Sequence, residues 1–107
     1  MSIILSKESK EYLKKNNASN FLVDIIFIEE PCTQIYLATI EKIEEADLEK
    51  YKDFEKVSKD NLILYLSDWF LEIYGKLEEF QLDVDGFFKK KLTIKNVNPI
   101  IKNTCKI

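Results

Sequence analysis

Cysteine is the residue type with the most chemical potential in this chain. It occurs twice, at Cys32 and Cys105, while histidine is absent. Without an imidazole, most nucleophile–base pairs and most zinc sites are excluded. Thiolate chemistry remains, and two thiolates are half of a four-thiolate zinc or iron–sulfur site. A complete site would need a second copy of the chain or ligands of another type.

Two other interpretations of the cysteines stay open. They could be small, inert hydrophobic residues. They could also be a redox-sensing dithiol that closes Cys32 to Cys105, which requires their Cα atoms to come within about 7 Å. We find no signal-peptide pattern and no apolar run near the roughly 18 residues of a membrane-spanning helix. We therefore expect a cytoplasmic protein in which the thiols are reduced and this disulfide is disfavoured.

Carboxylates offer a weaker hypothesis. Asp83 and Asp85 would lie on one face of a strand, about 7 Å apart, and could serve acid–base chemistry or bind a hard metal ion. The solvated face of an alternating strand predicts the same pattern, and we favour it. Asp24 interrupts an apolar run, where a buried carboxylate would need a partner. Phosphate-binding loops and Ser-His-Asp sets are absent from the sequence, so we do not expect an enzyme.

Charge and composition indicate one folded domain, residues 1–107, with a flexible C-terminal tail over about 96–107. The chain is 46% hydrophobic and 33% charged, which is typical of a globular domain. Its formal charge of −3 comes from 16 basic and 19 acidic residues mixed along the chain, so we expect neither nucleic acid nor a membrane as partner. The only basic run, Lys89–Lys91, is interpreted as a solvated turn.

Short strands and two short helices must position the cysteines. Ser6 is the expected N-cap of the first helix, which Asn16-Asn17 closes, and Gly75 ends the second. Residues 41–56 are interpreted as an edge excursion with a helical turn. The fold class is mostly β (α+β), a compact sandwich or twisted sheet with a helix packed on it. Strands are expected at residues 3–5, 21–28, 35–40, 61–66, 80–85 and 92–94.

The aromatic residues divide into two groups. Trp69, Phe70 and Tyr74 occur at spacings typical of a core. Phe87 and Phe88 follow the turn dipeptide Asp85-Gly86, and adjacent residues of a strand point to opposite faces, so one of them is expected to be exposed or to lie in an interface. This favours an alternative function, a non-metal interaction module that oligomerises or docks a partner through Phe87 or Phe88 and the Ile100-Ile101 tail.

Several motifs follow one another in a recognisable order. Ser2-Ile3-Ile4-Leu5-Ser6 precedes a helix, Cys32 follows a strand, Gln81-Leu82-Asp83 lies in a later strand, and Asn98-Pro99 stands six residues before Cys105. In this order, and over nearly the whole chain with a weaker match over residues 41–60, they resemble the A-type iron–sulfur cluster carrier family (HesB/IscA-like).

The resemblance implies a HesB-like fold of small β-sheets with an N-terminal helix, and a homodimer or higher homo-oligomer. It also implies binding of a [2Fe-2S] or [4Fe-4S] cluster, or iron, by Cys32 and Cys105 at a subunit interface, for transfer to apo client proteins of iron–sulfur cluster assembly. The family usually has a third cysteine in a Cys-Gly-Cys ending and a glycine beside its first cysteine. This chain has neither, so it resembles a divergent member. The alternative is a HesB-like interaction module without cluster binding.

Overall fold

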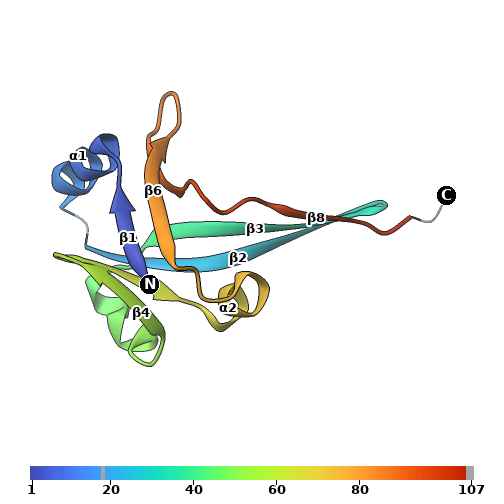
Figure 1. The fold of residues 1–107 in the computed structure, drawn as a ribbon, viewed down its shortest axis with the longest axis horizontal. Coiled ribbons are helices and arrows are strands. Elements are labelled where there is room, and N and C mark those ends of the chain that lie inside the picture. Colours follow the sequence, from blue (N-terminus) through green and yellow to red (C-terminus); the bar gives the residue numbers. More distant parts are fainter. Residues whose placement is uncertain (18, 106–107) are drawn as a thin grey trace.

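Strands dominate the structure, a computed structural model that describes residues 1–17 and 19–105. The expected mostly β, α+β class is confirmed, because the strands form two sheets and the helices are short (Figure 1). In chain order the elements are β1 (Ser2–Leu5), α1 (Lys7–Asn16), β2 (Asn20–Glu30), β3 (Thr33–Lys42), the 3-10 helix η1 (Glu45–Tyr51), β4 (Glu55–Lys59), β5 (Leu62–Leu66), α2 (Asp68–Tyr74), β6 (Glu79–Asp85), β7 (Lys91–Ile94) and β8 (Ile100–Asn103).

The larger sheet has five strands in the order β4-β5-β2-β3-β8. Its centre is β2, which pairs antiparallel with β3 and parallel with β5. β2 and β3 form a long hairpin whose distal part extends beyond the other elements, with β8 alongside (Figure 1). The strands predicted at residues 21–28 and 35–40 are therefore confirmed as β2 and β3.

The smaller sheet, in the order β1-β6-β7, packs against one face of the larger sheet. Apolar residues of both sheets and of α2 form a single buried cluster between these two layers. Alternate residues of β2 point into it, since Phe21, Val23 and Ile25 are buried while their neighbours are not. The largest side chains with almost no exposure are Phe70, Phe80, Leu64, Leu66, Leu82, Leu92 and Val23.

Helix α1 begins and ends as the sequence predicts, and α2 ends at the predicted Gly75. The Ser6 hydroxyl accepts a hydrogen bond from the backbone N–H of Ser9 at 3.0 Å, and Asn17 ends α1 in the left-handed conformation. The Ser67 hydroxyl caps α2 through the N–H of Phe70 at 3.0 Å, and Gly75, at φ +74°, ends it. No helix in the described part of the chain has the length and apolar character needed to cross a membrane.

Two strands lie where none was expected. β4 begins at the end of the predicted excursion, residues 41–56, which also contains η1, and its one buried residue, Val57, lies just beyond that range. β8 lies inside the expected flexible tail and pairs with β3, from Thr33 opposite Asn103 to Tyr36 opposite Ile100. Residues 106 and 107 lie outside the described part of the chain. The tail is therefore tied to the larger sheet just beside the β2–β3 turn.

Candidate thiol site

The tip of the β2–β3 hairpin is a two-residue turn made of Pro31 and Cys32, between the last strand pair, Glu30 and Thr33. The ring of Pro31 holds its φ at about −65°, and Cys32 adopts φ +67°. This combination is found in a type II turn. Cys32 is exposed. Cys32 therefore follows a strand, as the sequence predicts.

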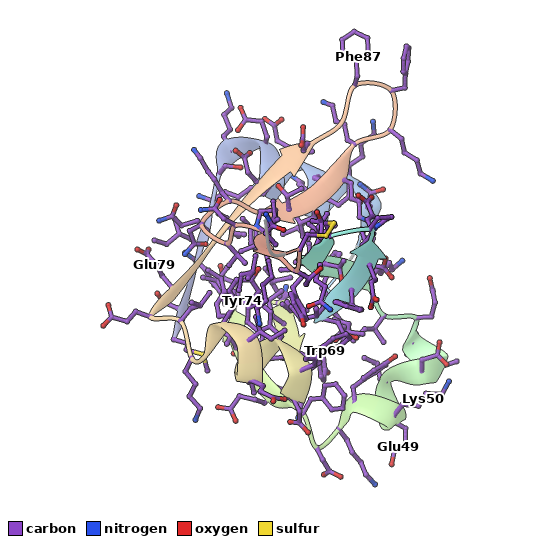
Figure 2. The ribbon with its side chains drawn as sticks, turned by 90° about the vertical axis from the view of Figure 1, so that its right-hand side faces the viewer. Glu49, Lys50, Trp69, Tyr74, Glu79 and Phe87 are labelled. Atoms are coloured by element: carbon purple, nitrogen blue, oxygen red, sulfur yellow. A yellow bond between two sulfur atoms is a disulfide. The ribbon has the colours of Figure 1, made fainter. Side chains whose placement is uncertain are left out.

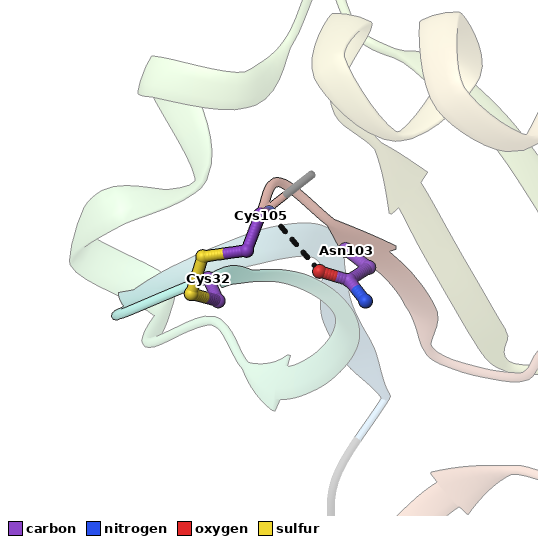
Figure 3. Close-up of a disulfide and its surroundings, with 3 residues drawn as sticks. All are labelled: Cys32, Asn103 and Cys105. Carbon is purple, nitrogen blue, oxygen red and sulfur yellow. Dashed lines mark hydrogen bonds between the residues drawn. A yellow bond between two sulfur atoms is a disulfide. The ribbon is translucent and has the colours of Figure 1, made fainter. Parts of the chain in front are cut away.

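Backbone hydrogen bonds bring Cys105 to the same tip. The N–H of Thr104 donates to the carbonyl of Cys32 at 2.9 Å, which extends the β3–β8 ladder. The N–H of Cys105 then donates to Oδ1 of Asn103 at 3.1 Å (Figure 3). These bonds hold Cys105 at the tip of the hairpin.

Cys32 and Cys105 form a disulfide (Figure 3). Their Cα atoms are 4.6 Å apart, within the range of protein disulfides. The expectation that this bond is disfavoured is therefore wrong for this structure. The reason is β8, whose pairing with β3 holds Cys105 directly beside the turn. The distance also meets the requirement of a dithiol pair that closes within one chain.

The left-handed conformation of Cys32 predicts an effect of substitution. Cys32→Gly and Cys32→Ala both remove the disulfide, but only glycine adopts positive φ without steric conflict. We expect Cys32→Gly to be more stable than Cys32→Ala by about 1 kcal/mol in urea unfolding. The control is Ser58, in the edge strand β4, where glycine should be the less stable of the same two replacements. Equal stabilities at position 32 would contradict a retained type II turn.

The donor set at this tip consists of the two sulfurs. Among residues 1–17 and 19–105 no group of three or more His, Cys, Asp or Glu side chains is placed to hold one metal ion. Glu29 and Glu30, the nearest carboxylates in sequence, are exposed on β2. One chain therefore offers half of a four-sulfur ligand set, and a complete set requires ligands from outside it.

The aspartates singled out by the sequence have local hydrogen-bond partners. Oδ1 of Asp83 accepts from the N–H of Val84 at 2.8 Å and from the hydroxyl of Ser6 at 2.9 Å, which links β6 to the start of α1. These two bonds hold the pKa of Asp83 below its usual value. Asp85 is exposed at the end of β6, and half-buried Asp24 accepts from the N–H of Ile25 at 2.8 Å. The carboxylates therefore serve local structure.

The lowered pKa of Asp83 predicts how acid affects stability. Ionised Asp83 stabilises the fold fully at pH values above its unfolded-state pKa of about 4. This contribution is lost as pH falls through the lower pKa of the folded state. We expect Asp83→Asn to be less stable than the native chain at pH 7, with the difference shrinking below about pH 4. Urea unfolding measured across this range checks it, with exposed Asp85→Asn as the control. A difference that does not change with pH would contradict the assignment.

The aromatic residues are placed partly as expected. Phe70 and Tyr74 lie in or against the core, whereas Trp69 is 41% exposed and contacts Tyr36 edge-on at 6.5 Å between ring centroids. The rings at positions 87 and 88 are both almost fully exposed, although the sequence predicts one. The Asp85-Gly86 turn carries both residues out of the strand, so strand alternation does not apply to them.

We compared the chain with known protein families, curated proteins and solved structures. Neither a protein-family model, nor a curated protein, nor a solved structure matches this chain.

Proposed function

We propose that this chain, when reduced, binds iron or an iron–sulfur cluster through Cys32 and Cys105 and carries it to apo client proteins in the cytoplasm. The observation that carries the proposal is the meeting of two sulfurs, one from a mid-chain turn and one from the C-terminal end, at an exposed tip. The resemblance of the ordered sequence motifs to A-type carriers supports it. Both [2Fe-2S] and [4Fe-4S] clusters are compatible with cysteine ligands.

Binding begins with reduction. A sulfur atom in a disulfide cannot act as a thiolate ligand. A thiol reductant must first supply two electrons, which with two protons convert the bond into two thiols. Each thiol then loses its proton to become a ligand. Because Cys32 and Cys105 are both exposed, a reductant and an iron donor can reach them. The same exposure suits a carrier, which must also release what it holds.

A second copy of the chain is the proposed source of the remaining ligands. Two chains supply four sulfurs, the set that cysteine-ligated clusters require. A shared site of this kind places the two thiol tips together, so the surface around the tip must suit self-association. A homodimer is the simplest symmetric arrangement that does this.

An aliphatic patch beside the tip supports this arrangement. It lies on the face of the larger sheet opposite the core, and strand pairing aligns its members, Ile26 with Leu37 and Ile28 with Ile35 and Ile101. Ile26 is 47% exposed and Ile101 65% exposed, while the other three members are partly exposed. Contiguous exposed aliphatic side chains commonly mark an interface. The patch consists of Ile26, Ile28, Ile35, Leu37 and Ile101.

Anaerobic reconstitution tests the proposal. The native chain is reduced, supplied with iron and sulfide, and desalted, and bound iron, bound sulfide and visible charge-transfer absorption are measured. We expect one cluster shared by two reduced chains, and none in the oxidised chain or in the variants Cys32→Ser and Cys105→Ser. Reduced native chain without bound iron, or serine variants that retain the native amount of it, would overturn the proposal.

The aliphatic patch has its own test, which keeps both cysteines. Ile101→Lys is expected to lower both the dimer fraction in sedimentation equilibrium and the cluster yield. The matched control is Lys102→Ser, the neighbouring residue on β8, whose ammonium group lies over the Tyr36 ring on the other face of the sheet. Equal losses in the two variants would exclude this patch as the interface.

A dithiol switch without metal is a second candidate, which the disulfide itself favours. In that case the native chain would pass reversibly between disulfide and dithiol in glutathione buffers, and the reduced form would bind no iron. The reconstitution described above separates the two candidates. The remaining alternative, an interaction module, is supported by a different feature, the exposed turn between β6 and β7, which lies away from the hairpin tip (Figure 1).

A further inference from the structure

Residues 86–91, which are the connection between β6 and β7 together with the first residue of β7, include two almost fully exposed aromatic rings. Phe87 is 92% exposed and Phe88 is 97% exposed, with their ring centroids 5.0 Å apart. Figure 2 shows Phe87 projecting from the far end of this turn, away from the rest of the chain. Lys89 and Lys90 follow directly and are also exposed. Exposure of apolar rings to water is unfavourable, and exposed apolar groups with a polar rim are typical of a contact surface.

The charge around this tip differs in sign from that of the whole chain. α1 and residues 86–91 line a common groove, whose charged lining residues are Lys15, Lys89, Lys90, Glu8 and Glu11. The two whole segments together carry seven lysines and two glutamates, whereas the chain has a formal charge of −3. Asp85, at the end of β6, and Glu41, which pairs with Lys91 at 4.0 Å, reduce this local positive charge without cancelling it. The end of the molecule that bears the exposed rings is therefore positive, and its partner should be negative.

The size of the tip limits what that partner can be. Two phenylalanine side chains bury about 300–500 Å² at most, below the roughly 800 Å² that each side of a stable protein–protein interface contributes. A convex tip of this kind therefore makes a poor interface with a folded protein or with a second copy. A lipid surface has no such requirement, because a narrow apolar tip can enter the boundary between headgroups and acyl chains while its cations stay at the headgroups.

We propose that residues 86–91 dock the chain onto an anionic lipid bilayer. Phe87 and Phe88 enter the interfacial region, and Lys89 and Lys90 lie at the negative headgroups. This departs from the sequence expectation that the chain has no membrane partner. It is independent of metal binding, since the turn lies away from the end of the hairpin that carries Cys32 and Cys105 (Figure 1). A docked chain would keep its thiol tip free.

Vesicle co-sedimentation of the full-length chain tests the proposal. The probes are vesicles of phosphatidylcholine alone and of phosphatidylcholine with phosphatidylserine. We expect binding to the anionic vesicles, weakened by added salt, and little binding to the neutral ones. Phe87→Ser with Phe88→Ser should lower the partition coefficient at least ~100-fold, and Lys89→Gln with Lys90→Gln about 30-fold.

The matched control removes two lysines elsewhere. Lys50→Gln with Lys52→Gln changes the net charge by the same amount on η1 and the residue after it, and we expect less than about a threefold effect. Because all substituted side chains are exposed, circular dichroism should show an unchanged fold. Absent binding by the native chain, equal binding to neutral vesicles, or an equal loss in the control would overturn the proposal. So would a dimer in solution that the phenylalanine replacements dissociate, which would assign the tip to a second copy.

Discussion

Reduction of the Cys32–Cys105 bond is expected to lower the free energy of unfolding by about 4 kcal/mol. The two residues are 73 positions apart in the sequence, so the bond closes a long loop in the unfolded chain and removes much of its conformational entropy. The folded chain changes far less, because β8 stays hydrogen-bonded to β3. The bond therefore acts mainly by raising the free energy of the unfolded state.

Urea unfolding with and without tris(carboxyethyl)phosphine measures this effect. The matched control is the double variant Cys32→Ser with Cys105→Ser, which should have the stability of the reduced chain in both conditions. A loss of less than about 1 kcal/mol on reduction would contradict the entropic account. The outcome bears on the proposed function, because the form competent to bind iron is then the less stable one, and pairing with a second copy would restore part of the difference.

Replacement of Phe70 is the second large expected effect. Phe70→Ala should lower the free energy of unfolding by about 4 kcal/mol, through lost burial and the cavity left behind. Its side chain is fully buried, stacks on Tyr74 at 5.2 Å between ring centroids, and lies 6.0 Å from Phe80 of the smaller sheet. It therefore attaches α2 to the core between the two layers.

Trp69 provides the matched control, since it is the preceding residue of the same helix and is 41% exposed. Trp69→Ala should cost about 1 kcal/mol, because its loss leaves no enclosed cavity. Both variants are compared with the native chain in urea under oxidising conditions, which keep the disulfide constant. Equal losses in the two variants would mean that α2 is not anchored through its buried ring.

Local signals explain which elements the sequence predicts. Ser6, Asn17 and Gly75 act within one turn of helix, and the alternation of residues 80–85 reflects one buried face of β6. Each of these features depends on neighbours in the sequence. The helix ends and the half-exposed strand could therefore be predicted from the sequence without knowledge of the tertiary structure.

The unexpected features depend on distant parts of the chain. β8 has the sequence Ile-Ile-Lys-Asn, which lacks a distinct strand pattern, and it forms because the edge of β3 is available to pair with it. The disulfide follows from that pairing. Composition carries no information about the pairing, and by itself it predicts reduced thiols. The convergence of Cys32 and Cys105 was expected from the family resemblance, whereas their bonding within one chain depends on the position of β8. The exposure of Phe87 and Phe88 likewise depends on where the turn begins.

The bond between the hairpin tip and the C-terminal end makes residues 32–105 a covalent ring, with the first 31 residues as a branch attached to it. A protease that cuts the ring once, for example in the exposed segment after Gly86, would open it without releasing a fragment. Both pieces would stay joined until a reductant arrived. The oxidised form of the two sulfur atoms would therefore resist fragmentation, and the reduced form would be the one ready to bind a soft metal.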